Sequence, residues 1–207
     1  MEYINKINLF NDWGSINEYI EEKNLSLKNK INSLNFDNFK KGDDVLIAEL
    51  ISVYTIEIPK IVDTEDNIKI DAQEDNINIH SDNYQFNYGR NEPSFAKGLS
   101  IIVKVSFIGN SSLFRHRPSR YTSSGTPSAE VNNKYITLSY KTIEKDPDKI
   151  KKLWINDIEE IKKNLGWIEN DVKIYNDSIG EKIKTMIKNR KKEINEYNSL
   201  IEKIKEK

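Results

Sequence analysis

The chain has 207 residues, with 32 lysines and arginines against 33 aspartates and glutamates, so its formal net charge is −1. The absence of cysteine excludes disulfides, thiolate zinc sites and a cysteine nucleophile. No apolar run approaches the roughly 18 residues of a membrane-spanning helix, and the first residues lack the apolar stretch of a signal peptide. We therefore expect a soluble cytoplasmic protein of one domain, or of one domain with an appendage, that does not bind membranes.

The first helices are predicted from capping and periodicity. Ser15 and Glu18 have the spacing of a capping box, in which each side chain satisfies an amide donor at a helix start. Apolar residues then repeat at three and four residues, which predicts a helix over about residues 16–34. A second short helix is predicted over residues 45–54, and it ends before Pro59 because proline cannot continue a helix.

From about residue 56 the apolar period changes to two, which predicts short antiparallel strands. Residues 68–70 and 77–79 mark two such strands, and the acidic residues 71–75 are predicted to form a solvated turn between them. Residues 99–108 form the most hydrophobic strand. The Asn-Asn pair at 132–133 is typical of a two-residue hairpin, because asparagine tolerates positive φ. We expect five to seven strands in total.

The last third is predicted to be a long, coiled-coil-like helical hairpin. Asp146 has the place of an N-cap and Pro147 that of the first helical position, and the polar residues 176–178 have the appearance of a break between two helices. Heptad spacing in the second helix predicts residues that pack on the sheet or assemble with a partner chain, namely Ile187, Arg190, Ile194, Tyr197, Ile201 and Ile204. The predicted fold class is α+β, with an α+β domain over residues 1–145 and the hairpin over residues 146–207.

Charge is distributed unevenly along the chain. Residues 1–80 carry 8 cations and 16 anions, whereas residues 81–145 carry 9 cations and 4 anions. Among the 32 cations 27 are lysine, which is typical of an AT-rich genome, and only five are arginine: Arg90, Arg115, Arg117, Arg120 and Arg190. Four arginines retained between positions 90 and 120 therefore mark the segment where an anionic partner would bind.

A long basic loop, which begins with residues 109–122, follows the most hydrophobic strand and contains the candidate binding residues. Three guanidinium groups within six residues suit bidentate pairing with phosphate or carboxylate, and nearby hydroxyls add donors. The predicted anion- or partner-binding residues are Arg115, His116, Arg117, Ser119 and Arg120, with Glu130 and Arg90 in support. The alternative is structural, because the arginines could pair with acids of the negatively charged first third or of a neighbouring subunit. His116 is a poor candidate base, since no second catalytic group lies near it in sequence.

Part of the chain resembles a group of uncharacterised bacterial proteins. In these a strand ending in Gly-Asp or Gly-Asn leads to Leu-Phe, then to Arg-Pro-Ser, and then to a Pro-x-Ala-Glu-Val strand. The matching residues here are Gly109-Asn110, Leu113-Phe114, Arg117-Pro118-Ser119 and Pro127-Ser128-Ala129-Glu130-Val131, with further matches at Trp167, Asp171-Val172, Asn176 and Arg190. The likeness covers roughly residues 85–200 and is most specific over residues 105–131. The group looks like the N-terminal module of larger proteins with TIR-like or restriction-nuclease-like domains, which implies a role in antiviral defence.

Three functions are consistent with these patterns. The first is a non-catalytic sensor or assembly module of a bacterial antiviral defence system. Its basic loop would bind nucleic acid, a nucleotide or a partner, and its heptads would form a homo-oligomer or join a larger effector protein. The second is a metal-dependent nuclease or phosphodiesterase, in which carboxylates such as Glu130 hold Mg²⁺ beside the arginines. The third is a plain scaffold subunit of a larger complex. No phosphate loop, dinucleotide fingerprint or nucleophile elbow occurs, so no cofactor is expected.

Overall fold

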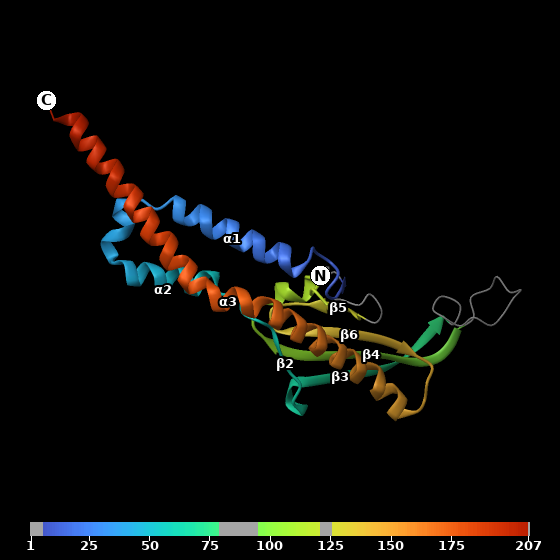
Figure 1. The fold of residues 1–207 in the computed structure, drawn as a ribbon. Helices are drawn as coiled ribbons and strands as arrows, with labels where there is room; N and C mark the ends of the chain where they lie inside the picture. Colours follow the sequence, from blue (N-terminus) through green and yellow to red (C-terminus); the bar gives the residue numbers. More distant parts are fainter. Residues whose placement is uncertain (1–5, 79–94, 121–125, 207) are drawn as a thin grey trace, which may run out of the picture.

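The structure, a computed structural model, describes residues 6–78, 95–120 and 126–206. An antiparallel sheet lies at one end of the molecule and a group of helices at the other, and one helix, α3 (Pro147–Lys205), runs along both (Figure 1). At 1.5 Å per residue the 59 residues of α3 extend about 88 Å. The predicted α+β class is therefore confirmed.

The sheet has β4 at its centre. The described residues form six strands, within the predicted five to seven: β1 (Ile7–Asn8), β2 (Lys60–Val62), β3 (Ile68–Asn78), β4 (Phe95–Ile108), β5 (Ser128–Val131) and β6 (Tyr135–Thr142). Their order is β1-β5-β6-β4-β2, and β3 pairs with the same edge of β4 as β2 does. All of these pairings are antiparallel. The sequence predicted a strand over residues 99–108 from its hydrophobicity, and β4 begins four residues earlier.

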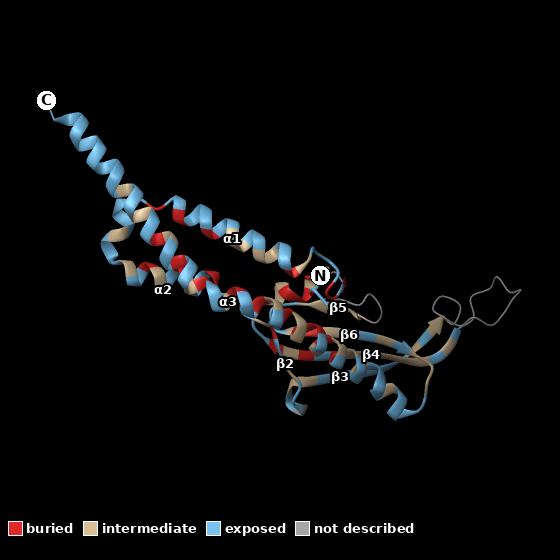
Figure 2. Ribbon diagram, viewed as in Figure 1, coloured by how far each residue is buried: buried red, intermediate tan, exposed pale blue. Residues whose placement is uncertain are grey.

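One face of the sheet is covered by the first half of α3 (Figure 2). Alternate residues of β4, such as Val103 and Val105, are buried in one core with Ile158 and Ile161 of α3. A hydrogen bond of 2.6 Å from the Tyr140 hydroxyl to Asp157 also ties the sheet to this helix. The residues between the buried ones, such as Lys104 and Thr137, lie on the opposite face of the sheet, which we call the open face.

The second half of α3 is flanked by two shorter helices, α1 (Ile16–Asn32) and α2 (Asp43–Tyr54) (Figure 1). The predicted capping box of α1 is present, with the Glu18 carboxylate accepting from the Ser15 N–H at 2.7 Å and the Ser15 hydroxyl accepting from the Glu18 N–H at 3.2 Å. Three short 3₁₀ turns complete the described elements: Phe36–Lys41, Glu65–Asn67 and Ser111–Arg115.

The predicted helical hairpin is wrong, because α3 is continuous. Asn176, expected at a break, instead binds the chain just after α2. Its side-chain oxygen accepts from the Ile56 N–H at 3.0 Å, and its side-chain NH₂ donates to the Ile56 carbonyl at 2.9 Å. The neighbouring Tyr175 hydroxyl donates to the Tyr54 carbonyl at 2.9 Å. Tyr175 and Asn176 therefore form tertiary contacts that hold the end of α2 against α3.

The two predicted strands around residues 71–75 form one strand, β3, and the acidic residues lie inside it. They adopt a strand because β4 supplies backbone partners along its whole length. Two cross-strand ion pairs of 2.8 Å also offset their charge, one between Asp75 and Lys141 and one between Glu74 and Lys97. Ile79, which we assigned to the second strand, lies outside the described residues.

The turn between β5 and β6 has three residues, 132–134, where we predicted two. Neither asparagine adopts a positive φ. The Asn132 side chain closes the turn instead, since its oxygen accepts from the N–H groups of Lys134 and Tyr135, both at 2.8 Å. Asparagine is thus favoured here for its side-chain hydrogen bonds.

Candidate functional site

The basic loop leaves the end of β4 and is anchored by buried aromatic and aliphatic side chains. Gly109 has φ +99°, and a Cβ atom there would lie 2.7 Å from the Ile58 carbonyl oxygen, so glycine fits this turn where other residues would be strained. Leu113 and Phe114 are fully buried, and the Phe114 ring packs edge-on against Phe107 with centroids 4.8 Å apart. These contacts fix the loop on the covered side of the sheet.

Backbone hydrogen bonds join the loop to the segment before α1. The Trp13 N–H donates to the Arg115 carbonyl at 2.9 Å, and the Ile16 N–H donates to the Arg117 carbonyl at 2.8 Å. In return, the Arg117 N–H donates to the Gly14 carbonyl at 3.2 Å. The loop therefore holds the chain that leads into α1 in place.

Arg115 is bound within the chain. It forms an ion pair with Asp12, and its guanidinium lies 5.0 Å from the centre of the Trp13 ring. Only 28% of its side chain is exposed. Arg115 is therefore paired with an acid of the first third of the chain. This is the structural alternative to ligand binding that the sequence analysis left open.

His116 is buried between two aromatic rings. Its ring centroid lies 5.2 Å from that of Trp13 and 4.6 Å from that of Tyr19, and only 6% of the residue is exposed. Burial lowers the pKa of His116 below its usual 6.5, and this is opposed by the Gly14 carbonyl, 3.3 Å from Nδ1, and by nearby glutamates. The ring is therefore uncharged at neutral pH, and Nε2 has no hydrogen-bond partner among the described residues. An anionic ligand would not reach this side chain.

Ser119 fastens the loop to α3. Its N–H donates to one oxygen of Asp171 at 2.9 Å, and its hydroxyl donates to the other at 2.6 Å. Pro118 beside it is buried. The loop thus links the start of α1 to the middle of α3, and Ser119 acts in the structure as part of that link.

The loop's exposed cations are Arg117 and Arg120. In the part of the chain that the structure describes, no ion pair or side-chain hydrogen bond joins either guanidinium to another residue. Arg90, predicted to support them, lies outside the described residues. Of the predicted anion-binding set, these two arginines are exposed and unpaired within the described residues.

Glu130 lies apart from the arginines, on the open face of the sheet. It lines a hollow of about 380 Å³ together with Lys69 and Lys104. Sequence reasoning missed both lysines because they are far apart in the chain and meet only through the register of β3 and β4. The alternating polar residues of β4 and β6 are the sequence features that point to a polar open face.

The predicted assembly residues divide into two groups. Ile187 is buried in the core, and Arg190 donates from Nε and Nη2 to the Leu34 carbonyl at 3.1 and 3.0 Å, so both hold the molecule itself together. Ile194 is half-buried. The remaining three are exposed on α3: Tyr197 by 64%, Ile201 by 47% and Ile204 by 74%.

Comparison with known proteins identifies no relative: no family model, no curated protein and no solved structure matches the chain. Within residues 6–78, 95–120 and 126–206, no group of three or more His, Asp or Glu side chains is placed to hold a metal ion. None of the described helices combines the length and apolar character needed to cross a membrane.

Proposed function

We propose that the chain is a non-catalytic sensor and assembly module of a bacterial antiviral defence system. It pairs with a second copy of itself through the free end of α3, residues 194–205, and meets an anionic ligand or partner with Arg117 and Arg120. The sequence resemblance over residues 105–131 supports the defence context. The observation that carries the proposal is the exposed apolar surface on the free end.

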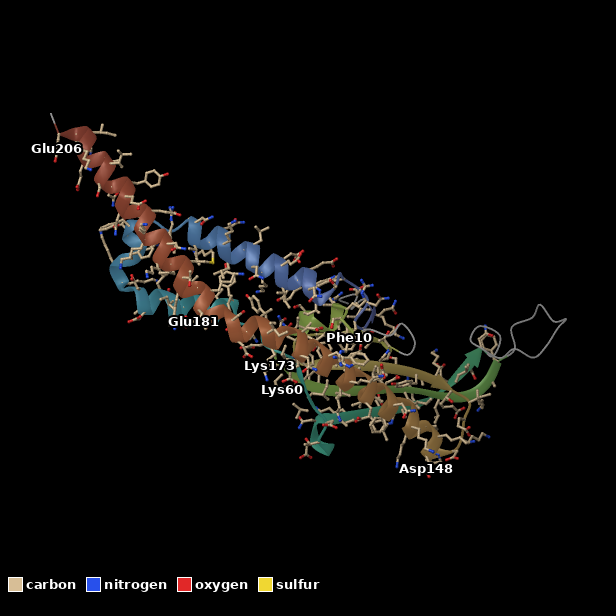
Figure 3. All side chains as sticks on the ribbon, in the orientation of Figure 1. Phe10, Lys60, Asp148, Lys173, Glu181 and Glu206 are labelled. Carbon is tan, nitrogen blue, oxygen red and sulfur yellow. The ribbon has the colours of Figure 1, made fainter. Side chains whose placement is uncertain are left out.

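Most of the free end of α3 is exposed. The ion pair of Lys191 with Asp43 at 2.7 Å ties α3 to the start of α2, and every described residue after the half-buried Ile194 is exposed where the helix projects from the molecule (Figures 2 and 3). Large apolar side chains nevertheless continue along it, including Leu200, which is 54% exposed. Because most helical stability in proteins comes from packing, a projecting helix with this composition is suited to a partner helix.

A second copy of the same segment is the simplest partner. The apolar residues repeat every seven positions, so the apolar stripe of one helix can pack against the same stripe of another copy. Ile194 and Ile201 form one seam, and Tyr197 and Ile204 the other. Full burial of such a side chain contributes about 1.5–3 kcal/mol, whereas association costs about 4–15 kcal/mol. Partial burial of four side chains from each copy therefore predicts a weak dimer that forms with rising concentration.

Sedimentation velocity over about 1 to 300 µM, the range of weak association, tests the assembly. We expect the wild-type chain to shift towards a dimer as its concentration rises. The double variant Ile201→Gln/Ile204→Gln should remain a monomer throughout. Ile174→Gln is the matched control, because Ile174 is 76% exposed on the same helix but away from the two seams. A wild-type chain that stays monomeric at every concentration would contradict the proposal.

Fluorescence anisotropy with labelled single-stranded DNA and RNA at low salt tests the role of the arginines. The variant Arg117→Gln/Arg120→Gln should bind at least about tenfold more weakly, because both phosphate-pairing guanidiniums are lost. Lys151→Gln/Lys152→Gln removes the same charge from exposed positions at the start of α3 and should bind within about twofold of wild type. Equal losses in both variants would mean that only net charge matters, and the loop would lose its assigned role.

A further inference from the structure

The open face of the sheet places two lysines directly opposite each other. Lys69 of β3 is the cross-strand partner of Lys104 of β4, and both side chains are exposed. Like charges in this position destabilise a sheet. Among the described residues neither lysine forms an ion pair, not even with Asp71, which lies two residues along β3 on the same face. The repulsion is therefore left uncompensated within the described chain.

These lysines form one end of the hollow of about 380 Å³. The strand register aligns Lys69 and Lys104 with Thr137 of β6 and Glu130 of β5 in a single row across the sheet. With neighbouring strands about 4.8 Å apart, the row spans about 14 Å between its terminal Cα atoms. It runs from two positive charges, past a hydroxyl, to one negative charge.

The other residues that line the hollow suit a polar ligand that includes a planar ring. Tyr135 and Ser139 of β6 contribute hydroxyl groups on either side of the row, and the half-buried Tyr135 also offers an aromatic ring. The volume lies within the range of small-molecule sites, about 300–1,000 Å³. An inorganic anion alone would leave most of this space and the Glu130 carboxylate unused.

We propose that the hollow binds a phosphate monoester of nucleotide or sugar-phosphate size. The phosphate lies between Lys69 and Lys104, where its charge relieves their repulsion. The Glu130 carboxylate accepts hydrogen bonds from hydroxyl or amino groups at the far end of the ligand. Binding here is independent of the assembly and the arginine contacts proposed above, because the hollow lies on the opposite face of the sheet from the loop and away from the free end of α3.

Isothermal titration calorimetry with AMP and with ribose 5-phosphate tests this site, with inorganic phosphate for comparison. We expect saturable binding of at least one of the two esters and weaker binding of inorganic phosphate. Lys69→Gln and Lys104→Gln should each weaken ester binding at least tenfold. Lys97→Gln should leave it unchanged, because Lys97 is also on β4 but lies on the other face, paired with Glu74 at 2.8 Å. Glu130→Gln should weaken binding of the esters and leave that of inorganic phosphate unaffected.

Thermal unfolding of the ligand-free variants separates lost binding from lost structure. Lys69→Gln and Lys104→Gln should melt at or above the wild-type temperature, because each removes a repulsive charge. The assignment is overturned if neither ester binds, if the lysine variants bind as wild type does, or if inorganic phosphate binds as tightly as the esters. Loss of single-stranded oligonucleotide binding in Lys69→Gln and Lys104→Gln, without any ester binding to the wild-type chain, would also overturn it.

Discussion

The buried ring of His116 makes the stability of the loop depend on pH. The unfolded chain takes up a proton near the usual pKa of 6.5, whereas burial lowers the pKa of His116 in the folded protein. Between these two pKa values the unfolded state binds more protons, so the free energy of unfolding rises with pH. It should therefore fall as the pH is lowered through the usual pKa of 6.5 towards the lowered pKa of the folded protein, by up to about 1.4 kcal/mol for each unit of pKa difference.

Urea unfolding at several pH values across this window measures the effect. His116→Phe keeps an aromatic ring between Trp13 and Tyr19 and removes the titrating group, so its stability should vary much less with pH. A wild-type slope that persists in His116→Phe would assign the pH dependence to other groups.

The Asn176 side-chain amide supplies hydrogen-bond partners to Ile56, which lies outside any helix or strand. It pairs with both backbone polar groups of Ile56 in a partly buried position. Asn176→Ala would leave those groups without partners, which should lower the free energy of unfolding by about 2 kcal/mol. Asn170→Ala is the control, because the exposed Asn170 amide donates only to the Gly166 carbonyl of its own helix. Similar losses in the two variants would contradict the tertiary role of Asn176.

Individual residues also explain which parts of the fold and site were predictable. The capping box at Ser15 and the Asp146 cap are local, since each partner lies within three residues, and sequence reasoning found both. Asn176 and its partner are 120 residues apart, so the same polar residue had the appearance of a helix break. Arg115 and Asp12 are 103 residues apart, and for that reason the sequence left both binding and internal pairing open.

Among the elements, α3 contains an interior glycine, Gly166. A Cβ atom at Gly166 would meet nothing within 4 Å, and the helix continues through it. Glycine in a helix costs up to about 1 kcal/mol relative to alanine, so Gly166→Ala should raise the free energy of unfolding by about 0.5–1 kcal/mol.

Gly109→Ala provides the contrast in the same urea unfolding experiment. It imposes a side chain at φ +99° and a contact of 2.7 Å with the Ile58 carbonyl, so it should destabilise the protein by more than about 1 kcal/mol. If Gly166→Ala lowered the free energy of unfolding, the open space around residue 166 would not explain the effect of the added methyl group.

The whole molecule is organised around one helix that has three different environments. The first part of α3 lies on the sheet, the middle lies between α1 and α2, and the last part is free (Figure 1). Local stability follows packing rather than helix continuity. Amide protection should therefore change along α3 although the helix is continuous.

Hydrogen exchange read residue by residue along α3 tests this organisation. In dilute solution the amides of buried residues from Ile158 to Ile187 should exchange slowly, close to the limit set by global unfolding, and those of residues 196–205 should exchange many-fold faster. At the concentrations where a dimer forms, protection should rise in residues 196–205 and stay constant in the packed part. Ile201→Gln/Ile204→Gln should abolish only that concentration-dependent rise. Uniform protection along α3 in the dilute monomer would show that residues 196–205 are packed in the monomer. The surface proposed for assembly would then not be free.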